Sequence, residues 1–290
     1  MLNNIRSKQV IIIVAMLALV GFLFTREIKG LVKPKEDAAQ VPASTELTNS
    51  NAPQLSLEEA SSTAKNLISV ASTKEITALE NAYNSASGEN KNAEANKLAK
   101  KWDDLEHAIP SAMYLELVAK NQPSSTSWLA AGDRFLKAFD NTPEEDPVRA
   151  TVLQKANVSF KNALAIDSTV IDAKTGLGVT IVNGAGAPME GIRLLMQVVA
   201  KDPKNLKANM NLGLFAIKSG QFDKAITRFK DIISNIGGTP DAYFYLATAY
   251  ESLGKKNEAI DAYLNSKKIT ANPTFIKFID SKLAELKNKR

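Results

Sequence analysis

An internal repeat of 34 residues is the feature of this sequence that most constrains its fold. Residues 211–230, NLGLFAIKSGQFDKAITRFK, can be laid over residues 245–264, YLATAYESLGKKNEAIDAYL, with every matched pair 34 positions apart. The matched pairs are Leu212 with Leu246, Gly220 with Gly254, Ala225 with Ala259, Ile226 with Ile260, and Phe229 with Tyr263. A period of this length indicates stacked supersecondary units, because one such unit cannot bury its apolar face alone.

The composition favours an all-α fold and excludes several kinds of chemistry. Helix-forming Ala, Leu, Lys and Glu are abundant in the 290 residues, and the aromatic-rich pattern of a β-sandwich is missing. The chain has no cysteine and one histidine, His107. Disulfides, thiolate metal sites and imidazole relays are therefore excluded, and we predict no catalytic residue, no metal site and no cofactor. The net charge of +5 is spread along the chain, which argues against nucleic-acid binding.

An apolar stretch near the N-terminus predicts a membrane anchor. Residues 10–24, VIIIVAMLALVGFLF, carry no charge and would reach about 22 Å as a helix. Flanking polar and basic residues extend this length to that of a bilayer span, so we predict a signal-anchor helix over residues 10–25 after a short tail, residues 1–9. A cleaved signal peptide and a buried helix are the alternatives. The bulky, charged residues that follow, TREIKG, do not resemble a cleavage site.

Two features of the flanking sequence give conflicting indications of membrane orientation. The basic residues are Arg6 and Lys8 before the span and Arg26, Lys29, Lys33 and Lys35 after it. That count leans towards a cytoplasmic C-terminal domain, whereas a short N-terminal segment before one span and a large domain is typical of export. We predict a single-pass protein of a bacterial-type cytoplasmic membrane with a periplasmic domain, and keep the cytoplasmic side as the alternative.

The residues after the anchor divide into a linker and two helices. Residues 26–55 are rich in Pro, Ala, Ser, Thr and Asn without apolar periodicity, which predicts a flexible linker. Residues 56–90 are expected to hold helices over 57–71 and 73–87. Their N-caps would be Ser56, with Glu59 three residues on, and Ser72, with Glu75 three residues on.

Residues 91–273 resemble the tetratricopeptide repeat family, whose 34-residue helix–turn–helix unit carries W-x2-L-G-x2-Y, then A-x3-F, then Pro. The clearest unit has Tyr243, Leu246, Ala247 and Tyr250, then Ala259 and Tyr263, then Pro273. The unit before it has Asn209, Leu212, Gly213 and Ala216, then Ala225 and Phe229. Three degenerate units precede these two, around Leu177, Gly178, Gly191 and Leu195, around Trp128, Gly132, Ala156 and Phe160, and around Leu98, Trp102 and Leu115.

The resemblance implies a right-handed α-solenoid of about five helix pairs, closed by a capping helix over residues 274–290. The small residues at its motif positions have a steric purpose, because Gly178, Gly213 and Ala225 allow two helix backbones to approach closely. Large rings such as Phe160 and Phe229 would fill the space beside each contact.

Four features that suggest ligand or catalytic sites have simpler explanations. Residues 183–191, NGAGAPMEG, are predicted to be a turn between helices, since no strand precedes them and the nucleotide-loop Lys is missing. Residues 140–147, DNTPEEDP, are predicted to be a loop with Asp146 as an N-cap. The charged residues within 103–107 are expected to form helix surface, and Trp102 and Trp128 to pack between helices.

The concave groove implied by the resemblance is the predicted functional site, and its occupant would be an extended peptide or a helix of a protein partner. The residues that helical spacing places on this face are Lys207, Met210, Asn211, Leu214, Ile217, Asp241, Phe244, Tyr245, Thr248 and Glu251. Lys207 and Asn211 do not suffice for a carboxylate clamp. An alternative is that the terminal helix or a second copy of the chain covers Met210, Leu214 and Phe244.

We therefore expect a non-enzymatic, membrane-tethered scaffold that binds proteins, in envelope assembly or a chaperone-like role. A self-associating structural protein is the first alternative. An RNA-binding helical-repeat protein is the second, and the acidic groove residues Asp241 and Glu251 argue against it.

Overall fold

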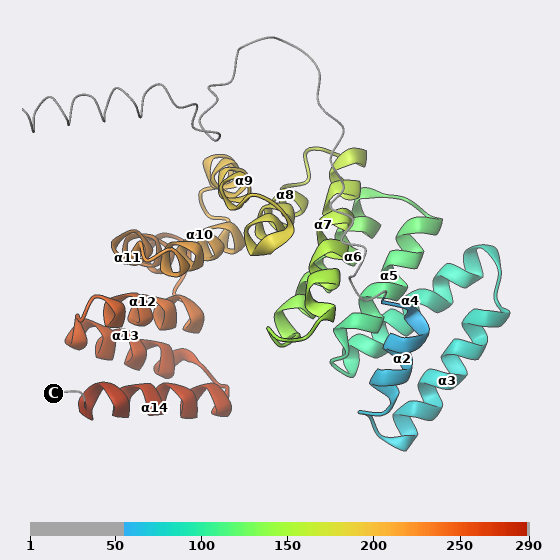
Figure 1. The fold of residues 1–290 in the computed structure, drawn as a ribbon, viewed down its shortest axis with the longest axis horizontal. Coiled ribbons are helices and arrows are strands. Elements are labelled where there is room, and N and C mark those ends of the chain that lie inside the picture. The colour runs from blue at the N-terminus through green and yellow to red at the C-terminus, as the bar shows by residue number, and fades with distance from the viewer. Residues whose placement is uncertain (1–54, 289–290) are drawn as a thin grey trace, which may run out of the picture. The chain divides into compact units, whose positions relative to one another are not determined.

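The helices predicted from the repeat are present in the computed structural model, which describes residues 55–288 (Figure 1). This part of the chain is all-α and contains no strand. The tail at 1–9, the anchor at 10–25 and the linker up to residue 54 lie outside the described residues. The helices are α2 (Leu57–Lys65), α3 (Val70–Ser85), α4 (Gly88–Asp104), α5 (Ala108–Asn121), α6 (Ser125–Asn141), α7 (Val148–Ile166), α8 (Ile171–Thr180), α9 (Pro188–Lys201), α10 (Leu206–Lys218), α11 (Phe222–Asp231), α12 (Pro240–Ser252), α13 (Lys256–Ile269) and α14 (Pro273–Asn288), with π-helical segments η1 (Ile181–Ala185) and η2 (Ile232–Ile236).

None of the helices between residues 55 and 288 has the length and apolar character needed to cross a bilayer. The predicted anchor at residues 10–25 is outside this range and stays a prediction.

The first two helices differ from the expected ones in where they end and begin. Ser56 caps α2 as predicted, because its Oγ accepts a hydrogen bond from the backbone amide of Glu59 at 3.1 Å. However, α2 ends at Lys65 instead of residue 71. The second N-cap is Ser69, whose extended backbone lets its Oγ accept from the amide of Ser72 at 3.1 Å. Ser72 was the predicted cap and instead lies inside α3, because Ser69 supplies the capping oxygen one turn earlier.

Consecutive helices pair along the chain, in the order α4 with α5, α6 with α7, α8 with α9, α10 with α11 and α12 with α13. Helix α4 begins at Gly88, so the first pair starts before the expected boundary at residue 91. The second pair has long helices, 17 residues in α6 and 19 in α7, and the connection between them is formed by residues 142–147. The last helices, α10 to α14, follow one another as successive layers (Figure 1).

Glycines bring neighbouring helices into close contact, as the motif positions predicted. A Cβ on Gly191 of α9 would lie 2.5 Å from the carbonyl oxygen of Gly178 in α8, so these two backbones touch. A Cβ on Gly132 of α6 would lie 2.7 Å from the ring of Phe160, and the same ring also occupies the space beside Gly176 of α8. One aromatic ring of α7 therefore fills the space between α6 and α8.

The apolar core runs along the series of helices. One buried cluster joins α2 to α5, a second joins α5 to α10, and a third joins α11 to α14. Trp102 and Trp128 are both buried in these clusters, which confirms their predicted packing between helices. The third cluster includes Ile279, Leu283 and Leu286 of α14, so this helix covers the apolar end of the last pair.

Candidate functional site

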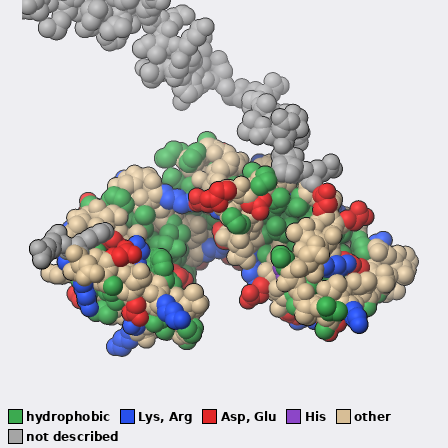
Figure 2. Space-filling model, turned by 60° about the horizontal axis from the view of Figure 1, so that its bottom comes forward, with side chains coloured by type: hydrophobic (Ala, Val, Ile, Leu, Met, Phe, Trp, Pro, Cys, Tyr) green, Lys and Arg blue, Asp and Glu red, His purple; other side chains and the backbone are tan. Residues whose placement is uncertain are grey.

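A groove of about 790 Å³ is lined by side chains from seven α-helices and η1, all within the compact unit formed by residues 50–290. Figure 2 shows the surface of this unit hollowed, with hydrophobic side chains in the hollow and charged side chains along its margin. Helix α10 supplies the floor through Leu214, Phe215 and Ile217. The other lining residues are Leu136, Phe139 and Asp140 of α6, Arg149 of α7, Val179 of α8, Asn183 of η1, Lys207, Asn211 and Lys218 of α10, Phe244, Tyr245, Thr248 and Glu251 of α12, Tyr263 of α13 and Lys282 of α14.

The residues predicted for the groove lie in it with two exceptions. Those that line it are Lys207, Asn211, Leu214, Ile217, Phe244, Tyr245, Thr248 and Glu251. Met210 is not among the lining residues because its side chain packs against the core of α11 to α14. Asp241 is exposed in the first turn of α12, outside the groove. The geometry thus groups the predicted residues, while their role in binding a partner stays a prediction.

Sequence reasoning missed the opposite wall, which comes from α6, α7, α8 and η1. Leu136, Phe139, Asp140, Arg149 and Val179 belong to the degenerate units, where no clear repeat register assigns a face to each residue. The acidic loop that follows Asp140 was a signal that this region is polar. The helical spacing of α6 alone could not show that this helix faces α12 across the groove.

An aromatic cluster closes the groove at the α12 end. The ring centroid of Phe244 lies 5.4 Å from that of Tyr263 and 5.4 Å from that of Phe275 in α14. It also lies 5.7 Å from the ring of Phe278. The terminal helix therefore covers Phe244 in part, as one of the alternatives left open by the sequence had it, while Phe244 still lines the groove. Leu214 also lines the groove, so the cover does not extend to α10.

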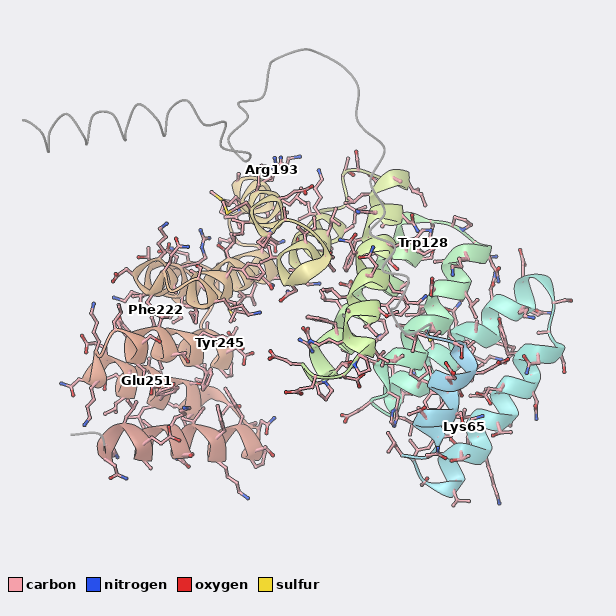
Figure 3. The ribbon with its side chains drawn as sticks, viewed as in Figure 1. Lys65, Trp128, Arg193, Phe222, Tyr245 and Glu251 are labelled. Carbon is pink, nitrogen blue, oxygen red and sulfur yellow. The ribbon has the colours of Figure 1, made fainter. Side chains whose placement is uncertain are left out.

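Two tyrosines in this region have perturbed acidities. Burial raises the pKa of Tyr263 to about 12, and its hydroxyl donates a hydrogen bond to Oε2 of Glu251 at 3.1 Å. Burial also raises the pKa of Tyr245, with the negative charges of Asp241 and Asp140 acting in the same direction. Figure 3 labels Tyr245 and Glu251 on α12. Both hydroxyls stay protonated at neutral pH. The hydrogen of Tyr263 is already donated to Glu251, so of the two only the Tyr245 hydroxyl can donate a hydrogen bond to a ligand.

Charged side chains occupy the other end of the groove. Asp140 lies near Arg149, Lys207 and Lys218, whose positive charges act on its carboxyl group. Desolvation is the larger effect and raises the pKa of Asp140, although the residue is exposed to solvent near the end of α6. The arrangement is a carboxylate beside three cations supplied by two other helices.

The remaining features singled out in the sequence have structural roles. Residues 183–191 include the predicted turn only at 186–187, since residues 183–185 end η1 and α9 begins at Pro188. The N-cap of α7 is Pro147 and not the predicted Asp146, because the helix begins one residue later than expected; Asp146 still accepts a hydrogen bond from the amide of Val148 at 2.9 Å. Asp103 forms ion pairs with Arg134 and Lys137 of α6. Within the described residues there is no group of His, Asp and Glu suited to a metal ion.

The fold and groove define a helical-repeat scaffold of the tetratricopeptide type, with a surface suited to protein–protein interaction. Residues 241–266 match the model of the tetratricopeptide repeat family. The fold is similar to that of TTC0263, a thermophilic TPR protein in Thermus thermophilus, with a TM-score of 0.52 and 16% identity over 67% of this chain and 98% of that one. It is also similar to PilW, a type IV pilus biogenesis factor, with a TM-score of 0.53 and 20% identity over 67% of this chain and 85% of that one. Among curated proteins, none matches. At these identities the similarity shows the fold.

Proposed function

We propose that this protein is a non-enzymatic scaffold, tethered to a membrane, that holds a segment of a partner protein in the groove between α6 and α12. The observation that carries the proposal is the groove itself, whose floor of Leu214, Phe215 and Ile217 is apolar and whose margins are charged. Apolar contacts provide most of the affinity of such a surface, and charges at the margin select the partner. We also propose that the solenoid has the right-handed twist implied by the family resemblance.

The partner proposal is tested by adding a charge to the groove floor. Leu214→Glu places a carboxylate where an apolar side chain of the partner would pack, so we expect capture to fall at least tenfold, since an unpaired buried charge costs more than about 1.4 kcal/mol. The measurement is quantitative cross-linking and mass spectrometry of proteins bound to the full-length protein in source-cell membranes. Leu264→Glu is the matched control, because Leu264 lies on α13 with 49% of its surface exposed, away from the groove.

Helical content by circular dichroism has to match in both variants. Equal capture by the wild type and Leu214→Glu would contradict a role for the groove. Phe244 is a poorer site for this test than its position on α12 suggests, because a charge there would also disrupt its contacts with Phe275 and Phe278.

The tether proposal places the repeat domain on the outer side of a cytoplasmic membrane, held by residues 10–25. Support comes from the uncharged stretch and from the linker that follows it. In cells whose outer barrier has been permeabilised, we expect an external protease to digest the chain down to the anchor while a cytoplasmic marker stays intact. Protection of the repeat domain would place it on the cytoplasmic side. Release of the intact chain by alkaline extraction would contradict the anchor.

A further inference from the structure

A second hollow, of about 360 Å³, lies between α2, the turn from α4 to α5 and the connection from α6 to α7. Helix α2, which packs against α5 (Figure 1), forms one of its walls, and we call the hollow the α2 pocket. It has no lining residue in common with the groove. A ligand of the α2 pocket would therefore bind independently of anything held in the groove.

The base of the α2 pocket is apolar. Ala64 of α2 and Ala108 of α5 are almost fully buried there, and Ile109 and Val148 are half-buried beside them. Leu67, which follows the end of α2, also lines the pocket and has 73% of its surface exposed. A ligand that fills the base and covers Leu67 would remove apolar surface from water, which favours binding.

The margin of the α2 pocket carries three carboxylates, those of Glu59, Glu106 and Asp146. None of the described side chains that line the pocket is a lysine or an arginine, and His107 adds no formal charge at pH 7. Glu59 accepts a hydrogen bond from Oγ of Ser56 at 3.0 Å, and Asp146 accepts one from a backbone amide of α7 at 2.9 Å. Within residues 55–288 no side chain pairs with the carboxylate of Glu106. The three negative charges are thus not cancelled by their own partners.

The residues around the pocket do not cancel this negative charge either. The charged residues next in sequence to the lining ones are Glu58, Lys65, Lys137, Asp140, Glu145 and Arg149, three of each sign. Lys65 forms an ion pair with Glu80, and Lys137 forms one with Asp103. Arg149 lines the groove instead of the α2 pocket. The pocket therefore keeps an excess of negative charge and attracts a cation.

Glu106 occupies a backbone position at which glycine is the usual residue. Its φ of 63° is the only positive one of a non-glycine residue between residues 55 and 288. The turns from α10 to α11 and from α12 to α13 have Gly220 and Gly254 at the equivalent position, with φ of 70° and 69°. In all three turns the amide of this residue donates to the carbonyl oxygen three residues earlier. Glu106 thus adopts a left-handed conformation that glycine would adopt more easily, and it adds a carboxylate to the pocket.

We propose that the α2 pocket binds a segment of a partner protein in which a lysine or arginine stands close to an aliphatic or aromatic residue. The carboxylates at the margin attract the cationic group, and Glu106 is the one without a partner of its own. The apolar side chain packs on Leu67 and on the base of the pocket. Lysine and arginine also carry apolar stems that suit such a base. The same carboxylates repel a nucleic acid or a phosphate group. The inference is independent of the proposed function of the groove.

The test is a selection from a library of random linear peptides on the full-length protein in detergent micelles. Wild-type protein is expected to enrich a class of peptides with Lys or Arg within a few residues of Leu, Ile, Val or Phe. For the most enriched peptide of this class, carrying a fluorescent label, Glu106→Lys is expected to raise Kd about tenfold or more, because an anion at the margin becomes a cation. Asp261→Lys is the matched control, since it makes the same charge change on the exposed surface of α13, and it should leave Kd unchanged.

Glu106→Gly separates binding from stability. Glycine adopts the left-handed conformation without strain, so the midpoint of urea unfolding is expected to stay the same or rise. Loss of the carboxylate is expected to raise Kd several-fold in the same variant. A residue that only shaped the turn would lose no affinity on replacement by the residue found at the two equivalent turns.

The apolar half of the pocket is tested with Leu67→Ser, which is expected to raise Kd several-fold. Val70→Ser is its control, because Val70 is 75% exposed and lies outside the lining. Both side chains are mostly in solvent, so helical content by circular dichroism should match that of the wild type. Raising the salt concentration is expected to weaken the wild-type complex more than the complex with Glu106→Lys.

Several results would overturn the inference, and they are distinct from failure of the proposed function. Enrichment of acidic or neutral peptides alone, no enrichment at all, or equal Kd for the wild type and Glu106→Lys refutes the basic specificity. A rise in Kd with Leu214→Glu would place the peptide in the groove, since Leu214 does not line the α2 pocket. Cross-links from α2 to the chain's own residues 26–54, or a doubled molar mass that Glu106→Lys reverses, would identify a different occupant. None of these results bears on capture through the groove, which Leu214→Glu tests separately.

Discussion

Phe160→Ala is expected to lower the free energy of unfolding by about 3–5 kcal/mol, the range for truncating a large ring in a packed core. Phe160 has no exposed surface. Its ring lies against Gly132 of α6 and Gly176 of α8, and neither glycine has a side chain that could move into the space left by the ring. The value is therefore expected in the upper part of the range. Urea unfolding of the full-length protein, followed by circular dichroism, measures it.

Phe160→Leu is the matched control for this prediction, because it keeps an apolar side chain between the two glycines and should cost less than the alanine variant. A further check uses the glycine that faces the ring. Gly132→Ala should destabilise the wild type, since its Cβ would lie 2.7 Å from the ring of Phe160. In the Phe160→Ala background the same change should cost less, because the space is empty. Equal costs in both backgrounds would show that the ring does not fill this space.

In a repeat protein, the position along the chain at which a substitution destabilises the fold is informative, as well as the size of the effect. Each helix pair contacts mainly its neighbours, so stability is roughly a sum of local terms. Loss of the Phe160 ring should increase amide hydrogen exchange in α6, α7 and α8 more than in α12 and α13. Uniformly faster exchange along the whole chain would indicate a single cooperative unit instead.

The sequence predicted the fold best where the repeat was regular. Around Leu212, Leu246, Phe229 and Tyr263 the spacing fixed which residues face the partner helix, and these four side chains are buried. The same spacing placed Leu214, Ile217 and Tyr245 on the groove side, where the structure has them. Helical periodicity sufficed because one helix face was already assigned to the core.

Prediction failed where a choice depended on contacts distant in sequence. Met210 has the spacing of a groove residue, yet it packs into the core of α11 to α14, because helix crossing angles decide which residues at the edge of a face are covered. The approach of α14 to Phe244 is a tertiary contact that no local pattern encodes. At the N-terminal end only Ser72 has a Glu three residues on, so the local pattern favoured Ser72, whereas the structure uses Ser69 as the N-cap.

The groove depends on both kinds of region. Its apolar floor comes from the regular unit that contains α10, whereas Asp140 and Arg149 come from the degenerate unit of α6 and α7. A degenerate repeat still has to keep the close helix contacts that hold its neighbours in position. This requirement explains why Gly132, Gly176, Gly178 and Gly191 are all placed at contacts between helices.

Gly191→Ala is expected to destabilise the protein by about 2–3 kcal/mol, although it replaces a glycine inside a helix with the best helix former. The new Cβ would lie 2.5 Å from the carbonyl oxygen of Gly178 and 2.9 Å from the backbone nitrogen of Val182. These are backbone atoms, which cannot rotate away as a side chain would. Helix α9 would have to move away from α8, and the contacts of Leu195 with the core would loosen.

The sign of this effect distinguishes a steric cause from helix propensity. At an open position Gly→Ala stabilises a helix by about 1 kcal/mol. Ala200→Gly, at an exposed position of the same helix, is the matched control and is expected to destabilise by about that amount. Opposite substitutions in one helix should thus both lower the midpoint of urea unfolding. A Gly191→Ala variant more stable than the wild type would mean that α8 and α9 do not touch through their backbones, and the steric account of the small motif residues would then be wrong.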